Sequence, residues 1–509
     1  MQILTCMKKI LTDSPITPIA NGLNKIAPLL LTSFGPDRGT IFCGGKIVSL
    51  YSGLLTLIKH EDAFENIAIK LVEDVANEVY TKAGSGVSLA AILTVGLVRA
   101  SRKLIVAGYH PRKVHDWLET VGKDCVGCLK AEAEYTHKLT WEGNEQRILR
   151  AIATTAAKDE VTGTIIGDMC HKIGEFAHID ITQDDIPKIR VEYRNGFTFK
   201  TNPLSYHFLK GKRKEFSHPK ILFTDGQLEN VQAMVNIMVA ANKAEVPLVV
   251  ICNGMSADVM SLMTHNHNIG ALDIMVLKSP GFNFGQFEAL EDLSVLTGGK
   301  PISYAQMETP TVEHLGTAPR IVVGPDYCTV YSDKPVPEGY IERVATRAAK
   351  QRSPILQLQT KERISNLRGL AAVLRVGGYT DRERQDGYQR VESTVHTVRG
   401  AQSEGYLPGG YQFFRRFAVL RPKVDIPTPI YEGMAFPYVA LMANYKGDVP
   451  AADRITDDSV TVFNLSTGKM EPMLTAGFID SAKSIRVAVE SAISIAKTLA
   501  ITGAIVAEQ

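Results

Sequence analysis

The pattern of apolar residues changes twice along the chain, and this constrains the fold more than any other feature. In the first third, apolar residues such as Phe64, Ile67 and Leu71 recur at helical spacing. Between residues 220 and 335, short apolar runs alternate with helical segments, which is typical of βαβ units with a largely parallel sheet. The helical spacing then returns and extends through 481–506. The sequence therefore predicts a helical domain built from both chain ends, with an α/β domain inserted between them.

Four apolar runs and two helical segments define the predicted α/β domain. Each run is short enough to be a buried strand. The helical segments supply the crossovers that parallel strands need. The predicted strands are Ile221–Phe223, Leu248–Ile251, Ile274–Leu277 and Ile321–Val323, and the predicted helices are 228–241 and 257–267.

Composition and charge exclude several classes of protein. The 509 residues carry 56 Lys and Arg against 54 Asp and Glu, and this net charge of +2 gives no support for a nucleic-acid or anionic-membrane partner. No uncharged stretch reaches the roughly 20 residues of a membrane span. The N-terminus shows no secretory or transit pattern, so we expect a cytoplasmic protein.

The seven cysteines are scattered along the chain, which suits a reducing cytosol better than a disulfide framework. Cys125 and Cys128 have the spacing of a metal or redox pair. However, the sequence holds no second such pair, and no histidine completes a zinc-finger pattern. Both cysteines lie in a helical pattern, which favours reduced thiols on a packed helix. We therefore predict no metal site at this pair.

A glycine-rich turn, Ala83-Gly84-Ser85-Gly86, precedes an apolar helical segment. Backbone N–H groups at a helix N-terminus bind phosphate when no side chain obstructs them. Ser85 and Ser88 would add hydroxyl donors. A plain turn between two helices explains the same residues at least as well. The motif is not a Walker A loop, because no Gly-Lys-Ser/Thr follows it.

A series of motifs, in order along the chain, resembles the GroEL-type group I chaperonins. The motifs are Glu61–Asn66, Ala83–Gly86, Lys278–Phe282, Leu296–Gly299, Arg390–Glu392 with His396 and Arg399, Gly405–Gly410 and Gly477–Asp480. The resemblance implies a multidomain α and α/β fold, the chaperonin fold, with a helical equatorial domain, a small hinge domain and an inserted α/β apical domain. The implied boundaries are 1–132 and 404–509 for the equatorial domain, 133–194 and 371–403 for the intermediate domain, and 195–370 for the apical domain.

The resemblance also implies an equatorial site for ATP with Mg²⁺, and this sequence departs from the family there. The acidic positions that bind magnesium or position the attacking water correspond to Ser52, Ser85 and Ser393. A hydroxyl cannot act as a carboxylate base near neutral pH or balance a magnesium ion. The other implied nucleotide-binding residues are Ser33, Gly35, Pro36, Gly84, Gly86, Val87, Ser88, Gly409, Gly410, Asn464 and Asp480.

Two interpretations of this site remain open. In one, a carboxylate elsewhere, such as Glu392, Asp381 or Asp386, compensates and ATP is hydrolysed. In the other, the chaperonin is degenerate and binds nucleotide weakly or not at all. Three serines at acidic positions favour the second interpretation, and a helical neighbour of Ser393 such as Glu392 points about 100° away from it. Tyr411, at the third glycine of the family turn, is expected to crowd the purine pocket.

The resemblance places a polypeptide-binding groove on the two helices of the apical domain and on an aromatic segment before them. Methionine is flexible and polarisable, which suits promiscuous apolar binding. On spacing alone, ordinary core packing explains the methionines somewhat better, but the family position favours an exposed groove. The implied groove residues are Tyr206, His207, Phe208, Val235, Met238, Met260, Thr264 and His265.

As a whole, the resemblance implies a ring-forming chaperonin that binds non-native polypeptides for folding, in homo-oligomeric rings of seven with a co-chaperonin lid. The alternative is a degenerate, non-hydrolysing structural or scaffolding ring. A metabolic α/β enzyme has little support, because no catalytic triad or metal cluster is visible. Between Gly410 and Pro437 the chain is shorter than the family and holds Pro422, Pro427 and Pro429, which predicts a trimmed helical hairpin.

Overall fold

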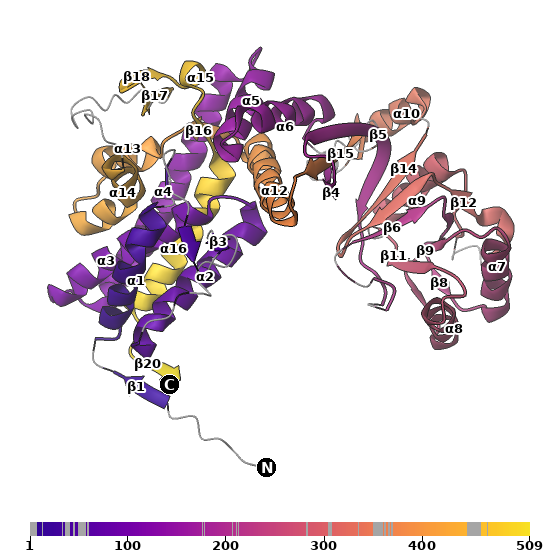
Figure 1. Cartoon of the computed structure of the whole chain (residues 1–509), viewed down its shortest axis with the longest axis horizontal. Coiled ribbons are helices and arrows are strands. Elements are labelled where there is room, and N and C mark those ends of the chain that lie inside the picture. Colours follow the sequence, from indigo (N-terminus) through magenta and orange to yellow (C-terminus); the bar gives the residue numbers. More distant parts are fainter. Residues whose placement is uncertain are drawn as a thin grey trace. The chain divides into compact units, whose positions relative to one another are not determined.

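The computed structural model shows two compact units, one formed by residues 1–175 together with 377–509 and the other by residues 176–376. The first unit is helical and the second is α/β, so the helical domain built from both chain ends is confirmed (Figure 1). The finer division at residues 132, 194, 370 and 403 stays a prediction. The structure describes residues 8–508 except 13, 33, 36–40, 44–45, 49–57, 59–60, 176, 178, 206, 210, 212, 281–283, 304–307, 334, 350–359, 361–362, 365–366, 368–369, 445–459 and 466.

The helical unit is organised around α16 (Ala482–Ala500), which packs against α2, α3 and α4 (Figure 1). Both α16 and α3 bury residues on most of their circumference, as core helices do. The other helices of the unit pack against α16 or against one another. They are α1 (Ile16–Thr32), α2 (Ala63–Ala83), α3 (Val87–Val106), α4 (Pro111–Thr140), α5 (Glu145–Ala157), α6 (Glu160–Ile173), α12 (Asp381–Glu404), α13 (Gln412–Leu420), α14 (Thr428–Ala443) and α15 (Met473–Ala476).

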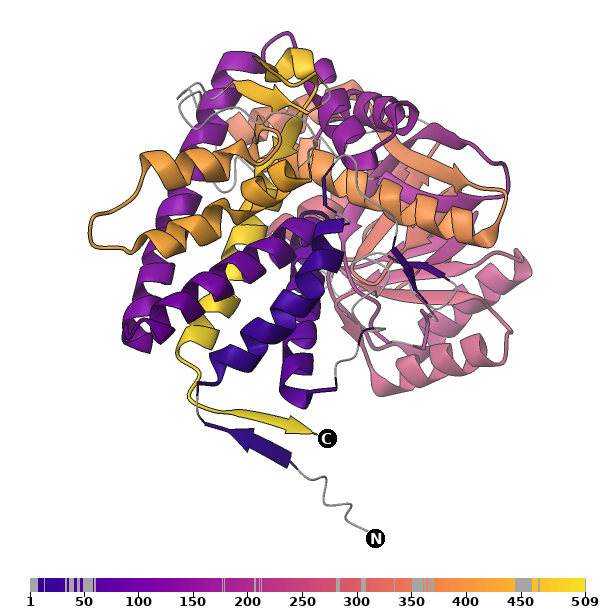
Figure 2. The same ribbon diagram turned by 60° about the vertical axis from the view of Figure 1, so that its left-hand side comes forward.

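Four antiparallel strand pairs complete the helical unit. β1 (Lys8–Leu11) pairs with β20 (Ile505–Glu508), so these two segments lie side by side near the chain ends (Figure 2). The helix predicted over 481–506 therefore ends too late, because the structure ends it at Ala500 and the chain then enters β20. The other pairs are β2 (Ile41–Cys43) with β3 (Lys46–Val48), β16 (Tyr406–Pro408) with β19 (Ile479–Ser481), and β17 (Thr461–Asn464) with β18 (Lys469–Pro472).

Three of the prolines after residue 420 lie where helices tolerate them, whereas Pro437 lies inside α14. Pro422 and Pro427 fall in the connection between α13 and α14, and Pro429 lies in the first turn of α14, where its missing N–H is not needed. These two helices pack against each other as a helical hairpin. Cys125 and Cys128 both lie on α4, as predicted, and Cys125 is buried. None of the described helices has the length and hydropathy to cross a membrane.

The α/β unit contains two main sheets. In the first, β7 (Lys220–Phe223), β9 (Leu248–Cys252) and β11 (Ile274–Lys278) are parallel, which confirms three of the predicted strands. The short strand β12 (Gly316–Thr317) pairs antiparallel with β7. The helices of this unit are α7 (Val231–Lys243), α8 (Ala257–Asn268), α9 (Phe284–Thr297) and α10 (Glu338–Ala349), with a single 3₁₀ turn, η4 (Val312–His314), and a small parallel pair, β8 (Gln227–Leu228) with β10 (Gly254–Met255).

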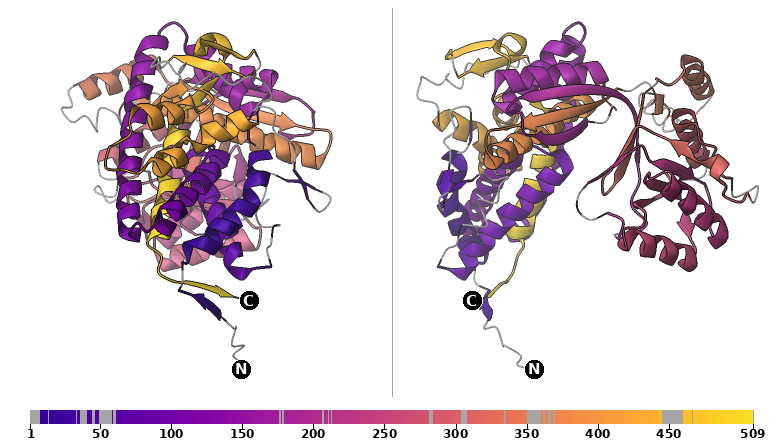
Figure 3. Two further views of the ribbon diagram at one scale, coloured as in Figure 1. Left: turned by 90° about the vertical axis from the view of Figure 1, so that its left-hand side faces the viewer. Right: turned by 45° about the vertical axis from the view of Figure 1, so that its right-hand side comes forward.

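The second sheet has the order β4-β15-β5-β14-β13-β6 and includes the long, curving strand β5 (Figure 3). The fourth predicted strand, Ile321–Val323, lies here as part of β13 and not in the parallel sheet. The turn before Tyr327 is too short for a parallel crossover, so β13 forms an antiparallel hairpin with β14. The strands are β4 (Ile179–Asp184), β5 (Ile189–Lys200), β6 (Lys214–Ser217), β13 (Arg320–Val323), β14 (Tyr327–Ser332) and β15 (Leu370–Gly377).

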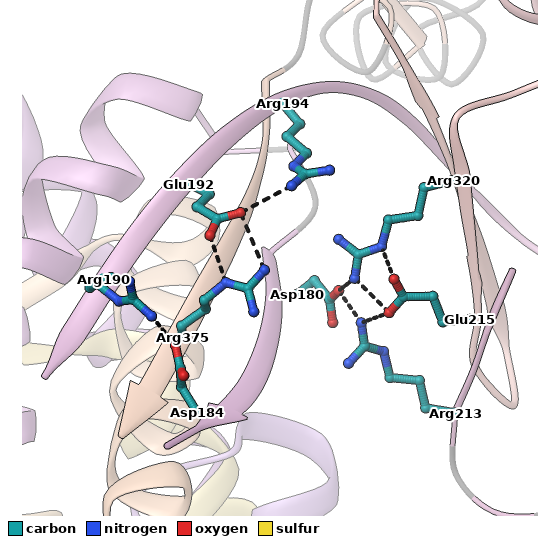
Figure 4. A network of polar contacts seen from close by, with 9 residues as sticks. All are labelled: Asp180, Asp184, Arg190, Glu192, Arg194, Arg213, Glu215, Arg320 and Arg375. Carbon is teal, nitrogen blue, oxygen red and sulfur yellow. Dashed lines mark hydrogen bonds and ion pairs between the residues drawn. The ribbon is translucent and has the colours of Figure 1, made fainter. Parts of the chain in front are cut away.

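A network of ion pairs spans this second sheet (Figure 4). Asp180 is almost fully buried, and its Oδ2 lies 2.6 Å from the guanidinium of Arg213 and 3.8 Å from that of Arg320. Arg320 also contacts Glu215 and stacks over the ring of Tyr331, 5.1 Å from its centre. Burial raises the pKa of Asp180, and the two arginines oppose that shift. The network thus links the edge strand β4 to β13 and to the edge strand β6.

Candidate functional site

A pocket in the helical unit lies at the N-terminus of α3. Its volume is about 160 Å³, and segments from widely separated parts of the chain line it. These segments are the turn at Phe34, the loop between α2 and α3, the end of α5, the middle of α12, and the junction between β19 and α16. The lining residues are Phe34, Gly35, Ser85, Gly86, Ser88, Leu89, Ile152, Thr155, Ala156, Lys158, Ser393, Thr397, Tyr411, Ile479, Asp480, Ser481, Ser484 and Ile485.

The loop between α2 and α3 needs glycine for two reasons. Gly84 and Gly86 both have left-handed backbone conformations, with φ of 66° and 88°. A Cβ atom on Gly84 would lie 2.3 Å from the Cβ of His396, and one on Gly86 would lie 2.9 Å from the carbonyl oxygen of Ser484. Gly86 is the N-cap of α3 and makes no side-chain cap, so the first N–H groups of α3 stay available at the pocket.

Two of the three serines predicted to replace acidic residues line this pocket. Ser85 is buried, and its hydroxyl oxygen lies 2.5 Å from that of Ser484 on α16. Ser393 also lines the pocket, from α12, one helical turn before Thr397. Ser52 lies outside the described residues. The structure therefore brings Ser85 and Ser393 into the lining of one pocket. Many of the other lining residues also carry hydroxyl groups.

The carboxylates considered as replacements are engaged elsewhere. Glu392 accepts a hydrogen bond from the hydroxyl of Tyr80 on α2, and Asp381 pairs with Arg384 in the first turn of α12. The carboxylate of Asp386 lies 3.9 Å from Arg382. None of the three is among the lining residues. Within the described part of the chain, the structure thus offers no substitute for the lost carboxylates from this set.

Asp480 is the one carboxylate among the described residues that line the pocket. It lies on β19 and accepts a long hydrogen bond, 3.5 Å, from the backbone N–H of Tyr411. Burial raises its pKa to about 7, while hydrogen bonds from Tyr411 and Gly410 oppose the rise. No basic side chain contributes to this shift, so Asp480 carries only part of its negative charge near neutral pH.

An aromatic pair closes one side of the pocket. The rings of Phe34 and Tyr411 are stacked, with centroids 5.2 Å apart and planes 7° from parallel. Tyr411 adopts a left-handed backbone conformation with φ of 56°, which is unusual for a residue with a large side chain. Tyr411 lines the pocket, and its crowding of a purine stays a prediction.

Only some of the other predicted nucleotide-binding residues line the pocket. Gly35, Gly86 and Ser88 line the pocket, and Gly84 lies beside it in the same loop. Gly409 and Gly410 lie just before Tyr411, whereas the side chain of Val87 is buried in the core of the helical unit. Asn464 is not among the lining residues, because it lies in the β17–β18 hairpin and donates a hydrogen bond to Glu471. Ser33 and Pro36 lie outside the described residues.

The surface of α7 and α8 is the second predicted site, and only part of it is exposed. Val231 and Val239 on α7 are exposed, and Val235 between them is half-buried. On α8, Met260 and Thr264 are half-buried and His265 is exposed. Val231, Val235 and Val239 thus form an apolar row along α7, and α8 lies beside this helix.

Two of the predicted groove residues are core residues instead. Met238 is 7% exposed and packs in the core of the α/β unit, because it lies on the face of α7 that covers the sheet. Phe208 is fully buried in the same core, although its neighbour His207 is exposed. The expectation that Met238 and Phe208 are exposed is therefore wrong. Tyr206 lies outside the described residues.

Comparison with known proteins agrees with this geometry. The profile of the TCP-1/cpn60 chaperonin family matches residues 54–420, which is more than half of the chain. The chain belongs to this family. It is 27% identical to the β subunit of the chloroplastic RuBisCO large subunit-binding protein of Pisum sativum, over 97% of this chain and 87% of that protein. It is 26% identical to the chloroplastic chaperonin 60 subunit alpha 2 of Arabidopsis thaliana, over 96% of this chain and 88% of that protein.

Solved structures show the same fold. The chaperonin gp146 from the bacteriophage EL 2 (Pseudomonas aeruginosa), crystallised in the presence of ATP-BeFx, superposes with a TM-score of 0.72 in one crystal form. This match covers 97% of our chaperonin and 98% of gp146 at 17% identity. A second crystal form gives a TM-score of 0.68 at 18% identity. The predicted chaperonin fold, with its multidomain α and α/β organisation, is thus confirmed.

The pocket residues of this chaperonin suit the phosphates of an ATP–magnesium complex but not its magnesium ion. The N-terminus of α3, the hydroxyls and Lys158 suit phosphate oxygens. Magnesium usually binds through one or two carboxylates together with phosphates and waters. Ser85 offers none, and Asp480 is the only carboxylate among the described lining residues. The described residues of this pocket therefore do not fit a magnesium ion.

Sequence reasoning missed several residues of this pocket. Lys158 ends α5 in a left-handed conformation and donates a 3.0 Å hydrogen bond to the carbonyl of Gly35. Nothing in the sequence links residue 158 to residue 35. Ser481 and Ser484, in contrast, follow Asp480 at the start of α16. Because Asp480 is a predicted site residue and Ser484 lies four positions after it, Ser484 could have been predicted from the sequence. Thr397 could have been predicted as a site residue too, because it lies one helical turn after Ser393.

Proposed function

We propose that this protein is a ring-forming chaperonin that binds non-native polypeptides for folding and whose nucleotide control is weakened. The observation that carries the proposal is the apolar row on α7, where Val231 and Val239 are 38% and 45% exposed. Large apolar side chains exposed in a row on one helix suit the capture of unfolded segments. Membership of the TCP-1/cpn60 family supports the same role.

The weak nucleotide control follows from the pocket. Phosphate-facing groups persist at the N-terminus of α3, while serines stand at the positions of the family's acidic residues. Losing a general base costs about 100- to 10,000-fold in rate, so hydrolysis of ATP is expected to be slow. The relative gp146 was crystallised with ATP-BeFx, which supports ATP as the ancestral ligand of this pocket.

The proposed partners follow from the family. We expect homo-oligomeric rings of seven subunits, non-native client polypeptides and a co-chaperonin lid. We also expect a cytoplasmic location, with no nucleic-acid or membrane partner. If the ring forms but binds no unfolded protein, the alternative of a structural or scaffolding ring holds instead.

Capture of a permanently unfolded reporter tests the proposal. A reduced and alkylated protein, labelled with a fluorophore, is mixed with the purified chaperonin and the bound fraction is measured after size-exclusion chromatography. We expect the label to coelute with the assembled ring. The same reporter in its native, disulfide-bonded form is the matched control and should elute alone. Coelution of neither form would contradict the proposal and favour the scaffolding ring.

A further inference from the structure

A second pocket of the helical unit lies where α4, the end of α12 and α16 meet. Its volume is about 530 Å³, which falls within the roughly 300–1,000 Å³ of small-molecule sites. Both chain ends contribute to its lining, through the last turns of α4, residues 402–405 and Arg486. It shares no lining residue with the pocket at α3. It is therefore a site of its own, with room for a small organic molecule.

The floor of this pocket is apolar. Leu129 and Ala133 lie one helical turn apart on α4, and both are buried. Gly405 lies opposite Ala133 with a left-handed backbone conformation, φ of 83°, that favours glycine. A Cβ atom on Gly405 would lie 3.4 Å from the Cβ of Ala133, so the missing side chain leaves the floor open. An apolar group of a ligand can rest on these three residues.

The two carboxylates of the described lining already have cationic partners. Glu404 accepts two hydrogen bonds of 2.7 Å from Arg486, and Glu134 accepts one of 2.8 Å from Lys138. Arg486 also donates a hydrogen bond to Glu490. Because these ion pairs balance their own charges, none of these side chains needs a ligand.

Lys130 is a cation of the same lining that makes no ion pair within the described part of the chain. It lies on the exposed side of α4. The hydrogen bond from Arg486 lowers the pKa of Glu404 against the effect of burial, and the charges of Lys483 and Lys130 add to that shift. These cations favour a negative group in the pocket. The carbonyl groups at the C-terminus of α12 repel one, so the negative group belongs beside Lys130 on α4.

We propose that this pocket binds a small organic carboxylate, with the carboxylate beside Lys130 and the apolar body on Leu129, Ala133 and Gly405. A neutral molecule of the same shape leaves Lys130 without a counter-charge, and a cation is repelled by it. The bound acid contacts both α4 and the end of α12, and so joins the two segments. This site goes beyond the chaperone role, because it depends neither on ATP nor on unfolded polypeptides.

A ligand-observed NMR titration of the full-length, assembled protein with sodium 2-naphthoate tests the inference. Two probes with the same ring system are the controls, the neutral 2-naphthamide and the cationic 2-naphthylmethylammonium. We expect 2-naphthoate to bind at least about threefold more tightly than either, because it alone forms a charge-assisted hydrogen bond with Lys130. Added salt should weaken its binding and leave that of the amide unchanged. Equal affinity for the three probes, or no binding of 2-naphthoate, would overturn the proposal.

Three variants at exposed positions locate the site. Lys130→Glu should reverse the preference, so that the ammonium probe binds more tightly than the carboxylate. Ser403→Trp, which places a large side chain in the lining, should block every probe. Lys123→Glu makes the same charge change two helical turns earlier on α4 and should leave all affinities within about twofold. Unchanged 2-naphthoate binding in both Lys130→Glu and Ser403→Trp would show that the acid binds elsewhere, such as on the apolar row of α7.

Thermal unfolding separates loss of the site from loss of the fold. Because the three substitutions change exposed side chains, the midpoints without a probe should stay close to wild type. Saturating 2-naphthoate should raise the midpoint of wild type and of Lys123→Glu, since it binds the folded state. It should not raise the midpoints of Lys130→Glu and Ser403→Trp. An equal rise in all four proteins would contradict the proposed site.

Discussion

Ser85 and Ser484 share a hydrogen bond between their hydroxyl oxygens, which lie 2.5 Å apart at the N-terminus of α3. Both residues are buried, and they join the α2–α3 loop to the first turn of α16. The hydroxyl pair therefore ties the α2–α3 loop to α16.

The first prediction concerns ATP turnover. Because neither Ser85 nor Ser393 can bind magnesium or accept a proton as a carboxylate does, the wild-type protein should hydrolyse ATP about 100- to 10,000-fold more slowly than an ordinary group I chaperonin. Steady-state phosphate release with magnesium and potassium present measures this. Turnover at the ordinary level would show that a carboxylate outside the described lining has taken over the role.

Restoring the acidic residues should be strongly non-additive. Ser393→Asp alone should do little, because the metal ligand is still missing, while Ser85→Asp with Ser393→Asp, and with Ser52→Asp added, should raise turnover. Ser85→Asp alone should lower the thermal midpoint, since it buries a charge that has no basic partner. Ser403→Asp, exposed on the same helix as Ser393, is the control for added charge. Equal gains from each single variant would contradict the idea of one cooperating unit.

The second prediction separates the exposed row of α7 from its buried face. Val239→Ser should reduce the capture of unfolded protein and change the free energy of unfolding by less than about 0.5 kcal/mol, because the side chain is exposed. Met238→Ser, one residue earlier, should destabilise the fold by about 2–5 kcal/mol, because it removes buried volume from the core. Capture assays and denaturant unfolding of both variants check this. If Val239→Ser destabilised the fold and Met238→Ser reduced capture instead, the face of α7 that carries Met238 would be the exposed one.

The third prediction concerns the pH dependence of stability. Burial raises the pKa of Asp480 from its ordinary 3.8 to about 7, so the folded state holds this proton more tightly than the unfolded state. The contribution of Asp480 to the free energy of unfolding should therefore be greatest at low pH. It should fall as the pH rises from about 4 to 7 and stay level above that range. One pKa unit corresponds to about 1.4 kcal/mol, and because Asp480 is half-buried we expect a total loss of about 1–3 kcal/mol.

Asp480→Asn tests this assignment, since the amide resembles the protonated acid and cannot ionise. The variant should be more stable than wild type at pH 8, less so at pH 5, and about equally stable near pH 3, as measured by denaturant unfolding at the three values. Asp386→Asn removes an exposed carboxylate from α12 and controls for the loss of one negative charge. If Asp480→Asn destabilises the protein at pH 8, the carboxylate makes a favourable contact that outweighs its burial.

The fourth prediction concerns assembly. The purified protein should form a complex many times the 55.7 kDa of one subunit, as the family does. Light scattering after size-exclusion chromatography gives the mass, and class averages from electron microscopy give the number of subunits in a ring. A strict monomer at micromolar concentration would refute the ring and leave the exposed row of α7 without its proposed setting.

The glycine loop could be predicted from the sequence because local chemistry determines it. Two left-handed residues on either side of Ser85, followed by an apolar helix, leave few conformations open. The contribution of Lys158 could not be predicted, because it depends on how the end of α5 packs beside Gly35. Asn464, in contrast, was predicted at the site but lies outside the pocket lining. The resemblance places it at the nucleotide, but its side chain bonds Glu471 within its own hairpin.

Helical spacing also left two questions that only packing could answer. The spacing of α7 shows that the helix is amphipathic, but Met238 and Val239 are adjacent and periodicity alone did not assign the buried face. The apolar run Ile321–Val323 was correctly predicted as a strand. Its sheet was not, because a buried parallel strand and a central antiparallel strand have the same composition, and only the short turn before Tyr327 distinguishes them.

The last prediction concerns the ion-pair network of the six-stranded sheet (Figure 4). Asp180→Ala should destabilise the α/β unit by about 3–5 kcal/mol, because it leaves Arg213 and Arg320 near each other without their buried counter-charge. Asp180→Asn should cost less, since an amide oxygen still accepts a hydrogen bond. Arg194→Gln, which removes an exposed partner of Glu192, is the matched control and should cost less than about 1 kcal/mol.

Hydrogen exchange locates the effect. Because the network joins β4 to β13 and β6, the Asp180→Ala variant should lose protection in those strands first, while the parallel strands β7, β9 and β11 keep theirs. Arg194→Gln should leave both sheets protected. Loss of protection confined to the parallel sheet, or equal stability of Asp180→Ala and wild type, would show that the buried ion pairs do not hold the edge strands together.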